Sequence, residues 1–384
     1  MIMANNNENK ILNVPNLRFP EFSGEWKKAS LQDIATVNPK SVSLQDSFVY
    51  IDLEAVEKGE LKKIQEIIRK DAPSRAQRVI YKNDILFQCV RPYQRNNYIH
   101  KIQDKSNKQW VASTGYAQIR TTETQNYIYH LLNTDGFNRK VMVRCTGSSY
   151  PAINSEDLAT IRFYLATDTS EQLKISRLFD LLDERIATQN KIIEDLKKLK
   201  SAISLKVLHS CSWEQFKIKD IATIGRGRVI SSVEISQQVN PTYPVYSSQT
   251  SNEGIMGYLD DYMFEGEYVS WTTDGANAGT VFYRNGKFNC TNVCGLLKLR
   301  KDFDTHFVSL VLAEAAKKYV SINLANPKLM NNTMGNIQIR LPNLEEQKRI
   351  SIVFRKLQEL LAVHNSLLNV YSMQKQYLLS QVFI

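Results

Sequence analysis

The feature that most constrains this chain is a long heptad helix that occurs twice. From Glu171 to about Leu208, apolar residues recur every seven positions, as they do along the seam of a coiled coil. The same pattern returns 175 residues later, starting at Ile350. A polar residue interrupts both seams at the same slot, Gln189 in the first helix and His364 in the second. Chance is a poor account of two copies in register, so the pattern predicts two coiled-coil helices.

Each predicted helix also carries apolar residues beside its seam, so its apolar stripe is wider than one partner helix needs. A wide stripe indicates contact with more than one partner. The positions expected to make these contacts are Ile175, Phe179, Leu182, Ile186, Gln189, Ile193 and Leu196 in the first helix, and Ile350, Phe354, Leu357, Leu361, His364 and Leu368 in the second. The interleaved slot expected to complete the two seams holds Leu178, Ile192, Leu199, Val353, Leu360 and Leu367.

A second repeat lies upstream of each helix. The segment Trp26–Val37 (WKKASLQDIATV) returns 187 residues later as Trp213–Ile224 (WEQFKIKDIATI). Because the two kinds of repeat bracket dissimilar middles, the chain is predicted to be one unit duplicated: variable domain, helix, variable domain, helix. The expected boundaries are a disordered tail over 1–16, a first domain over 17–165, a helix over 166–210, a second domain over 211–341 and a helix over 342–384.

The two variable domains are predicted to have a mixed α+β fold with short strands in the same order. In the first domain we expect a short helix at 31–36, strands at 48–51, 85–87 and 116–119, and a helix near 127–132. In the second we expect strands at 244–247, 268–271, 281–283 and 296–299 and a helix at 307–319. Each domain closes on a Pro-x-aliphatic element, at Pro151 and Pro327, before a last strand near Ile161 and Ile337.

Positive charge is concentrated in the first domain. The whole chain has a net charge of +10, and residues 58–108 hold 13 basic and 5 acidic residues, an excess of eight. Such an excess beside Tyr, Asn and Gln is what a phosphate-contacting surface needs. A solvated basic face would have the same composition, so charge alone leaves both interpretations open.

Cysteine usage and hydropathy indicate a cytoplasmic protein without a metal centre. The five cysteines are odd in number and form no CxxC pair, so neither a disulfide framework nor a zinc site is expected. Cys290 and Cys294 alone make a weak metal pair. The first residues lack the apolar core of a signal peptide, and no apolar run of about 18 residues occurs, so no membrane contact is expected.

Sequence motifs of catalysis are absent. The chain has no Asn/Asp-Pro-Pro-aromatic run of an amino-methyltransferase, no phosphate-binding G-x-x-x-x-G-K-[ST] loop and no GxSxG elbow. The five histidines lie far apart in the sequence. Missing motifs do not exclude an enzyme, but they favour a binding protein with no catalytic residues and no cofactor of its own.

Two polar, basic loops of the first domain have the composition of a nucleic-acid contact. Arginine, glutamine and asparagine side chains can each make paired hydrogen bonds with guanine or adenine edges. The expected DNA-binding residues here are Arg75, Arg78, Gln88, Arg91, Tyr93, Gln94, Arg95 and Asn96. A turn rich in polar residues is the alternative interpretation of each loop.

The second domain has a glycine-rich loop at the matching place, over 272–279. Its glycines permit close approach of a ligand to the backbone. The expected DNA-binding residues of this domain are Thr273, Asp274, Asn277, Arg284, Lys287 and Asn292. A simple Asn- and Gly-rich turn again remains as the alternative.

Four segments in this order resemble the specificity (S) subunits of type I restriction-modification systems, the HsdS family. They are LRFPEFSGEW at 17–26, Asp-Ile-Ala-Thr at both domain starts, EQLKISRLFDLLDERI at 171–186 and LPNLEEQKRI at 341–350. The resemblance covers nearly the whole chain. It implies two target recognition domains that each read one half of a split, asymmetric sequence in double-stranded DNA, and two long helices that pack antiparallel as a spacer.

The resemblance also implies the partners. Two methyltransferase (M) subunits would dock on the spacer helices, and restriction (R) subunits would join in the full complex. S-adenosylmethionine, ATP and magnesium would be bound by these partners, and the chain itself would have no turnover. Two other readings stay open on the sequence: a self-sufficient DNA methyltransferase or nuclease, and a coiled-coil scaffold without a DNA role.

Overall fold

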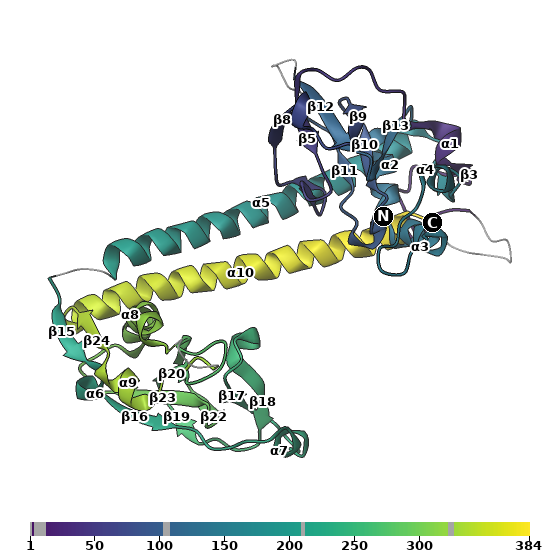
Figure 1. The fold of residues 1–384 in the computed structure, drawn as a ribbon. Helices are drawn as coiled ribbons and strands as arrows, with labels where there is room; N and C mark the ends of the chain where they lie inside the picture. The colour runs from purple at the N-terminus through teal and green to yellow at the C-terminus, as the bar shows by residue number, and fades with distance from the viewer. Residues whose placement is uncertain (1, 4–12, 103–107, 209–211, 322–325) are drawn as a thin grey trace. The chain divides into compact units, whose positions relative to one another are not determined.

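The structure is a computed structural model that describes residues 2–3, 13–102, 108–208, 212–321 and 326–384. The chain forms two compact units. Unit 1 contains Met1–Asn190 and Ser366–Ile384, and unit 2 contains Lys191–Asn365. Each unit therefore consists of one variable domain together with a part of each long helix (Figure 1).

Two helices of 39 residues each confirm the duplicated heptad helix: α5 (Thr169–Val207) and α10 (Leu344–Val382). Both begin at a short polar residue that caps the first turn. Asp168 accepts a hydrogen bond from the backbone N–H of Ser170 at 2.7 Å, and Asn343 accepts one from Glu346 at 2.9 Å. Side-chain oxygens at this position satisfy backbone donors that the helix cannot use itself.

Within unit 1 the two helices run antiparallel. Phe179 of α5 stacks on Phe383, which follows α10, with ring centroids 5.8 Å apart. Further along α5, Asp183 forms an ion pair with Lys375. Contacts that advance along one helix therefore move backwards along the other.

Within unit 2 the direction is the same. Lys200 Nζ donates to Gln358 Oε1 at 2.9 Å, and Ile203 joins a buried cluster with Phe354. The antiparallel pairing that the family resemblance implies is thus present in both units.

The buried stripe differs in one respect from the predicted seam. Phe179, Leu182 and Ile193 are buried, and so are Phe354 and Leu357. Half of the interleaved slot is instead open to solvent, with exposed fractions of 48% for Leu199 and 46% for both Val353 and Leu360; Leu178, Ile192 and Leu367 are half-buried. Two neighbouring stripes satisfy the same heptad period, and packing against the aromatic core of each domain selects the one that contains the two phenylalanines.

The first domain contains two four-stranded sheets. One has the order β11-β10-β13-β4, all antiparallel, and the other has the order β8-β5-β12-β9, with β5 and β12 parallel. The strands are β4 (Ala35–Val37), β5 (Ser47–Ile51), β8 (Gln65–Ile68), β9 (Ala76–Ile80), β10 (Ile85–Gln88), β11 (Tyr98–Ile99), β12 (Gln109–Ser113) and β13 (Tyr116–Thr121).

Smaller elements complete this domain. They are the ladder of β3 (Lys27–Ser30) with β14 (Arg162–Leu165), the hairpin of β6 (Val56–Glu57) with β7 (Glu60–Leu61), and the helices α1 (Leu31–Ile34), η1 (Arg69–Asp71), η2 (Pro92–Gln94), α2 (Gln125–Leu132), α3 (Asp135–Arg144) and α4 (Ser155–Ala159).

The second domain repeats this topology. Its sheets have the orders β16-β23-β20-β21 and β18-β17-β22-β19, again with one parallel pair, β17 with β22. The strands are β15 (Glu214–Lys217), β16 (Ala222–Arg226), β17 (Tyr243–Tyr246), β18 (Ile255–Leu259), β19 (Phe264–Glu265), β20 (Tyr268–Thr272), β21 (Val281–Arg284), β22 (Lys287–Cys290), β23 (Cys294–Leu299) and β24 (Gln338–Leu341). The helices are α6 (Ile218–Ile221), α7 (Ser232–Ser236), η3 (Ser251–Gly254), α8 (Thr305–Ala315), η4 (Ala316–Tyr319) and α9 (Asn331–Asn336).

One glutamine ties each domain to its long helix in the same way. Gln172 Nε2 donates to the carbonyl of Ala166 at 2.9 Å, and Gln172 Oε1 accepts from the N–H of Thr124, at the start of α2, at 3.2 Å. Gln347, 175 residues later, makes the two equivalent bonds to Pro342 and Asp304, at 2.8 and 3.0 Å. Both glutamines are about 1% exposed, so the duplication extends to individual buried hydrogen bonds.

Three local expectations need correction. The helix expected at 31–36 ends at Ile34, because residues 35–37 pair with β13 as β4. In the expected tail, Ile2–Met3 form β1 and pair with β2 (Leu17–Arg18), while residues 1 and 4–12 lie outside the described residues. Cys290 and Cys294 are joined as a disulfide, since they end one strand and begin the next, an arrangement that their spacing does not reveal.

Candidate functional site

A cavity of about 680 Å³ in the first domain gathers five of the predicted DNA-binding residues. They are Arg75, Gln88, Arg91, Gln94 and Asn96. The rest of the lining consists of Leu53, Glu54, Val56, Glu57, Val90 and Tyr150. We call this space the reading cavity. Most of its polar groups are guanidinium and amide groups. These two kinds of group form paired hydrogen bonds with base edges.

One wall of the reading cavity is formed by the loop of residues 89–97 between β10 and β11, which we call the reading loop and which has a constrained backbone. Strand β10 ends at Gln88, and the short helix η2 follows with Pro92 at its first position. Arg91 and Arg95, on either side of η2, have φ values of 54° and 55°, in the left-handed region. Non-glycine residues there cost about 1–3 kcal/mol and are found mainly at functional sites.

Gln88 organises this wall. Its side chain is 2% exposed; Nε2 donates to Gln94 Oε1 at 2.9 Å and Oε1 accepts from the N–H of Asn96 at 3.0 Å. The N–H of Gln88 donates to Asn97 Oδ1 at 2.8 Å. Because both ends of this amide are already used, Gln88 holds Gln94 and the backbone of Asn96 in place at the cavity wall.

Arg91 is held on both its backbone and its side chain. Its N–H donates to the carbonyl of Pro151 at 2.8 Å, and its guanidinium lies over the ring of Tyr150, 4.4 Å from the centroid. A cation above an aromatic face is stabilised by about 0.5–1 kcal/mol at an exposed site. Sequence reasoning did not identify Tyr150, although the Pro151 element beside it was noticed.

Three of the predicted residues do not line the reading cavity. Arg78 is partly buried, and its Nε has no hydrogen-bond partner; burial lowers the pKa of its guanidinium. Arg95 forms an ion pair with Asp135 of α3 at 2.6 Å. Tyr93, in η2, is 51% exposed and is free to contact a ligand outside the cavity.

In the second domain, the backbone identifies the position that corresponds to the reading loop. Gly275 donates its N–H to the carbonyl of Pro327 at 3.0 Å, as Arg91 does to Pro151. Its φ of 95° is also in the left-handed region. The loop 272–279 therefore does occupy the place that the sequence predicted, with a glycine where the first domain has an arginine.

The residues predicted in this second loop region have different environments. Thr273 is buried, and its Oγ1 lies 3.0 Å from Asp274 Oδ2 and 3.0 Å from the carbonyl of Val293. Asn277, Lys287 and Asn292 are exposed.

Arg284 differs most from its predicted role. It is 4% exposed; Nε donates to Ser270 Oγ at 3.0 Å and Nη2 donates to the carbonyl of Glu253 at 2.8 Å. Its guanidinium also lies 3.6 Å from the centroid of the Tyr246 ring. Burial lowers the pKa of Arg284 to about 10. With its donors committed inside the domain, Arg284 supports the loop at Glu253.

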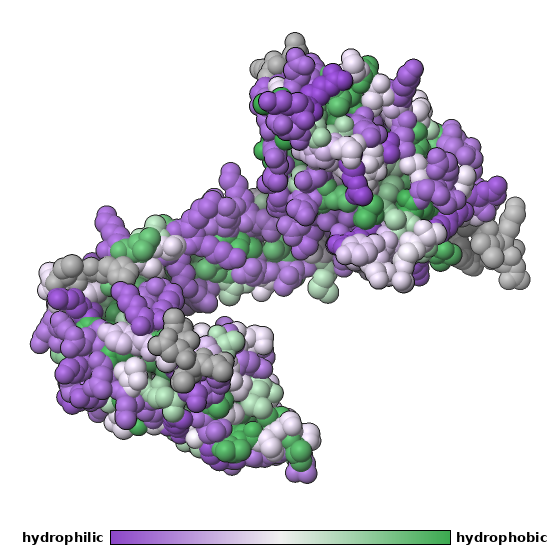
Figure 2. Space-filling view, in the orientation of Figure 1, coloured by the Kyte–Doolittle hydropathy of each residue, from purple (hydrophilic) through white to green (hydrophobic). Residues whose placement is uncertain are grey.

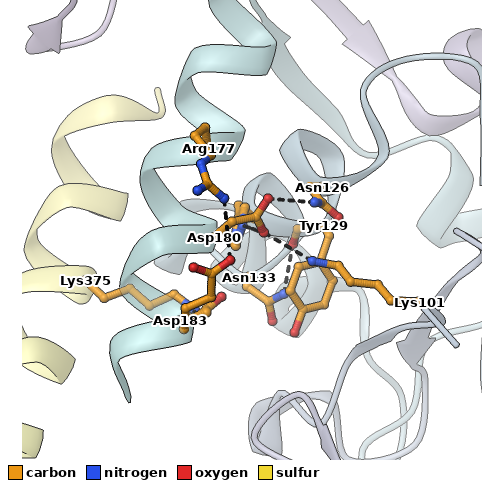
Figure 3. A network of polar contacts seen from close by, with 10 residues as sticks. Lys101, Asn126, Tyr129, Asn133, Arg177, Asp180, Asp183 and Lys375 are labelled. Atoms are coloured by element: carbon orange, nitrogen blue, oxygen red, sulfur yellow. Dashed lines mark hydrogen bonds and ion pairs between the residues drawn. The ribbon is translucent and has the colours of Figure 1, made fainter. Parts of the chain in front are cut away.

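Figure 3 shows a polar network in unit 1 that holds the first domain on α5. Asp180 of α5 accepts from Asn126 Nδ2 at 2.7 Å and from Lys101 Nζ at 3.2 Å. His130 Nε2 lies 3.6 Å from the same carboxylate. Burial alone would raise the pKa of Asp180, but His130 and Lys101 outweigh it and lower the pKa to about 2.

A family model described as the type I restriction modification DNA specificity domain matches residues 23–198 and 211–370. Two putative type I specificity subunits of Mycoplasma pneumoniae are 47% identical over 140 residues and 38% identical over 183 residues. These matches cover 36% and 47% of this chain, and 74% and 76% of the relatives. The specificity subunit of the type I restriction enzyme MpnII from the same organism is 44% identical over 36% of this chain and 42% of its own length.

Two solved structures share the fold along nearly the whole chain. The S subunit of a type I restriction-modification system from M. genitalium has a TM-score of 0.69 at 14% identity, covering 97% of this chain and 99% of its own. A chain from a study of complex assembly and conformational transition in the type I system has a TM-score of 0.56 at 19% identity, covering 93% and 97%.

Two kinds of feature are absent from the described residues. No helix there is long and apolar enough to cross a membrane. Within the same residues, no group of three or more His, Cys, Asp or Glu side chains is arranged to hold a metal ion.

Proposed function

This chain belongs to the type I restriction-modification DNA specificity family, and we propose that it reads a split, asymmetric sequence in double-stranded DNA. As a specificity subunit it is a non-catalytic component of a restriction-modification system. In this proposal residues 17–165 and 211–341 are the two target recognition domains, and residues 166–210 and 342–384 form the spacer.

The reading cavity is the observation that carries the proposal. Arg75 and Arg91 supply guanidinium groups, while Gln94 and Asn96 supply amides, around one space of about 680 Å³. In the major groove an arginine pairs with guanine and a glutamine or asparagine pairs with adenine. Glu54 and Glu57, which also line the cavity, can accept from the amino group of cytosine.

The two domains are proposed to read different half-sites. Their folds match strand by strand, but Arg91 in the first reading loop corresponds to Gly275 in the second. The first loop therefore presents a fixed cation, whereas the second presents backbone and the exposed Asn277. Unlike side chains on the same scaffold give an asymmetric target.

Two M subunits are proposed to dock on the spacer, with R subunits joining in the full complex. Exposed apolar residues support this docking: on α5, Leu205 is 68% exposed, and on α10, Ile352 and Met373 are 60% and 70% exposed. These side chains are open to contact by a protein partner, and Figure 2 shows apolar residues among hydrophilic neighbours on the long helices. A duplicated chain offers the same surface twice, which suits two copies of one partner.

S-adenosylmethionine, ATP and magnesium are then bound by the partners, and reading of DNA places the complex in the cytoplasm. The test is sequencing of methylated positions in DNA from cells that carry this subunit with its M subunit. We expect one bipartite motif with two different halves and a constant gap. An unsplit motif, or no dependence of methylation on this subunit, would refute the proposal.

A further inference from the structure

A second cavity in unit 1, of about 530 Å³, is surrounded by cations. Five of its lining residues are Lys28 of β3, Arg139, Lys140 and Arg144 of α3, and Arg162 of β14. The remaining lining residues carry no charge: Val143, Thr160, Ile161, Phe163 and Tyr164. We call this cavity the basic groove. Its cations lie outside the basic segment 58–108 to which the sequence drew attention.

Two cations of the basic groove, Lys140 and Arg144, are held by neutral acceptors, while Arg162 interacts electrostatically with the carboxylate of Asp33. Lys140 Nζ donates to the carbonyl of Arg162 at 3.0 Å. Arg144 Nη1 donates to the carbonyl of Asp157 at 2.8 Å and to Thr160 Oγ1 at 2.7 Å. Carbonyl and hydroxyl acceptors fix the side chains but leave their positive charge uncompensated. Burial, together with the charge of Lys28, lowers the pKa of Lys140, and a bound anion would relieve that repulsion.

Helix α3 connects the basic groove to the reading cavity. At its first residue, Asp135 forms an ion pair with Arg95 of the reading loop. Its residues from Arg139 onward supply three of the groove's cations. The chain after α3 then reaches Tyr150, which lies under Arg91 in the reading cavity. One ten-residue helix thus has the base-reading loop at its start and the groove at its end.

The second domain shows that the fold does not require two of these cations, Lys28 and Arg162. Its ladder of β15 and β24 repeats that of β3 and β14 in the same register. Gln215 occupies the position of Lys28, and Gln338 occupies that of Arg162. The two glutamines hydrogen-bond to each other. A neutral pair therefore occupies these two positions in the second domain, although Lys217 and Arg340 lie opposite them in the same ladder.

We propose that the basic groove binds the phosphodiester backbone of DNA beside the first half-site. The inference rests on the proposed DNA-reading function and adds a second contact surface to it. A duplex whose base edges meet the reading cavity extends past it with a regular series of phosphates, and clustered lysine and arginine side chains neutralise such a series. An acidic protein surface is the competing occupant, and the link through α3 to the reading loop favours DNA.

The test uses the full chain with Lys28→Gln and Arg162→Gln, the residues that the second domain has at these places. Binding to a fluorescently labelled duplex with the recognised sequence, and to one of unrelated sequence, is measured over a series of salt concentrations. Loss of two phosphate contacts should reduce the slope of log K against log salt by about 2. Affinity should fall by the same factor for both duplexes. Arg139→Gln alone, in an exposed side chain, should reduce the slope by about 1 and serves if the double variant fails to fold.

The control is Lys191→Gln with Lys197→Gln, which removes the same charge from exposed positions of α5 and should leave the slope unchanged. If the wild-type chain binds DNA but the groove variants keep the wild-type salt slope, the groove proposal is overturned and the proposed function stands. Groove variants that keep the slope but no longer assemble with the M subunit would overturn it too, and would identify the occupant as an acidic protein surface. A wild-type chain with no salt-dependent DNA binding would instead count against the proposed function itself.

Discussion

At the residue scale, Arg91 has the strongest case for a base contact. Its backbone and side chain are both fixed, by Pro151 and Tyr150, so little conformational entropy is lost when it binds a base. Arg91→Ala should weaken binding of the recognised sequence by about 1–3 kcal/mol and relax specificity at one position. Competition binding against single-base variants of the target measures both effects.

Arg91→Lys is the matched control, because lysine keeps the charge but lacks the planar fork that pairs with guanine. A base contact predicts that the lysine variant still loses discrimination at that position. If Arg91→Lys restores wild-type binding, and Arg91→Ala weakens all sequences equally, Arg91 contacts phosphate.

Residue types indicated the reading loop, but they did not separate ligand-facing side chains from supporting ones. Gln88, Gln94 and Asn96 look alike in the sequence, yet Gln88 is buried and the other two are not. Arg284 likewise is a residue type expected at a DNA contact, yet its side chain is buried like that of a structural residue. Burial of a side chain depends on which face of its strand is covered by the rest of the domain. Residue types alone do not contain that information.

At the element scale, Asp180 anchors α2 and its neighbouring loop to α5. Asp180→Asn keeps the size of the side chain but removes the charge that Lys101 and His130 face. At pH 7 we expect a loss of about 1–3 kcal/mol in the free energy of unfolding of unit 1, typical of a charged hydrogen bond that is not replaced. Denaturant unfolding, followed by a signal from unit 1, measures it.

The pH dependence of this effect follows from the lowered pKa of Asp180. A carboxyl whose pKa is about 2 in the folded state contributes stability above the ordinary value near 3.8, and that contribution is lost as the pH falls toward 2. The wild-type chain and Asp180→Asn should therefore converge in stability between pH 4 and 2. A constant difference over that range would show that the charge of Asp180 is not what matters.

The elements themselves were largely predictable. Heptads predicted α5 from Glu171 and α10 from Ile350, two and six residues after their observed starts at Thr169 and Leu344. Strand-like segments located β5, β10, β13 and β20. Helix α3 was missed, because DGFNRKVMVR is strongly polar and has no regular apolar stripe. Its packing beside α2 stabilises it as a helix, and that tertiary effect outweighs the local pattern.

At the scale of the whole molecule, stability should depend on pH through buried histidines in unit 1 and the half-buried His306 in unit 2. Burial lowers the pKa of His100 and of His306 to about 4, and it also lowers that of His130. In the unfolded chain each returns to about 6.5, so the folded state loses stability as the pH falls from 6.5 toward 4. The melting temperature should fall between pH 7 and 5, where few other groups titrate, and that of His306→Asn should fall less steeply. A flat profile over that range would contradict this assignment.

The duplicated architecture also predicts how the target sequence divides between the two domains. Each variable domain packs on helix segments of its own compact unit, so under the proposed function the side chains that meet one half-site lie within one unit. Replacing residues 211–340 with the corresponding domain of another family member should change one half of the methylated motif. The other half and the gap should stay the same, because 17–165 and both helices are untouched.

The reciprocal exchange of residues 17–165 is the matched control, and it should change the opposite half. Methylation sequencing of cells that carry each chimera reads both halves and the gap in one experiment. If either exchange alters both halves together, the two domains do not read independently, and the duplication of fold would not be a duplication of function. If the halves change as expected but the gap changes too, each domain rather than the helices sets the spacing, which would contradict the assignment of α5 and α10 as the spacer.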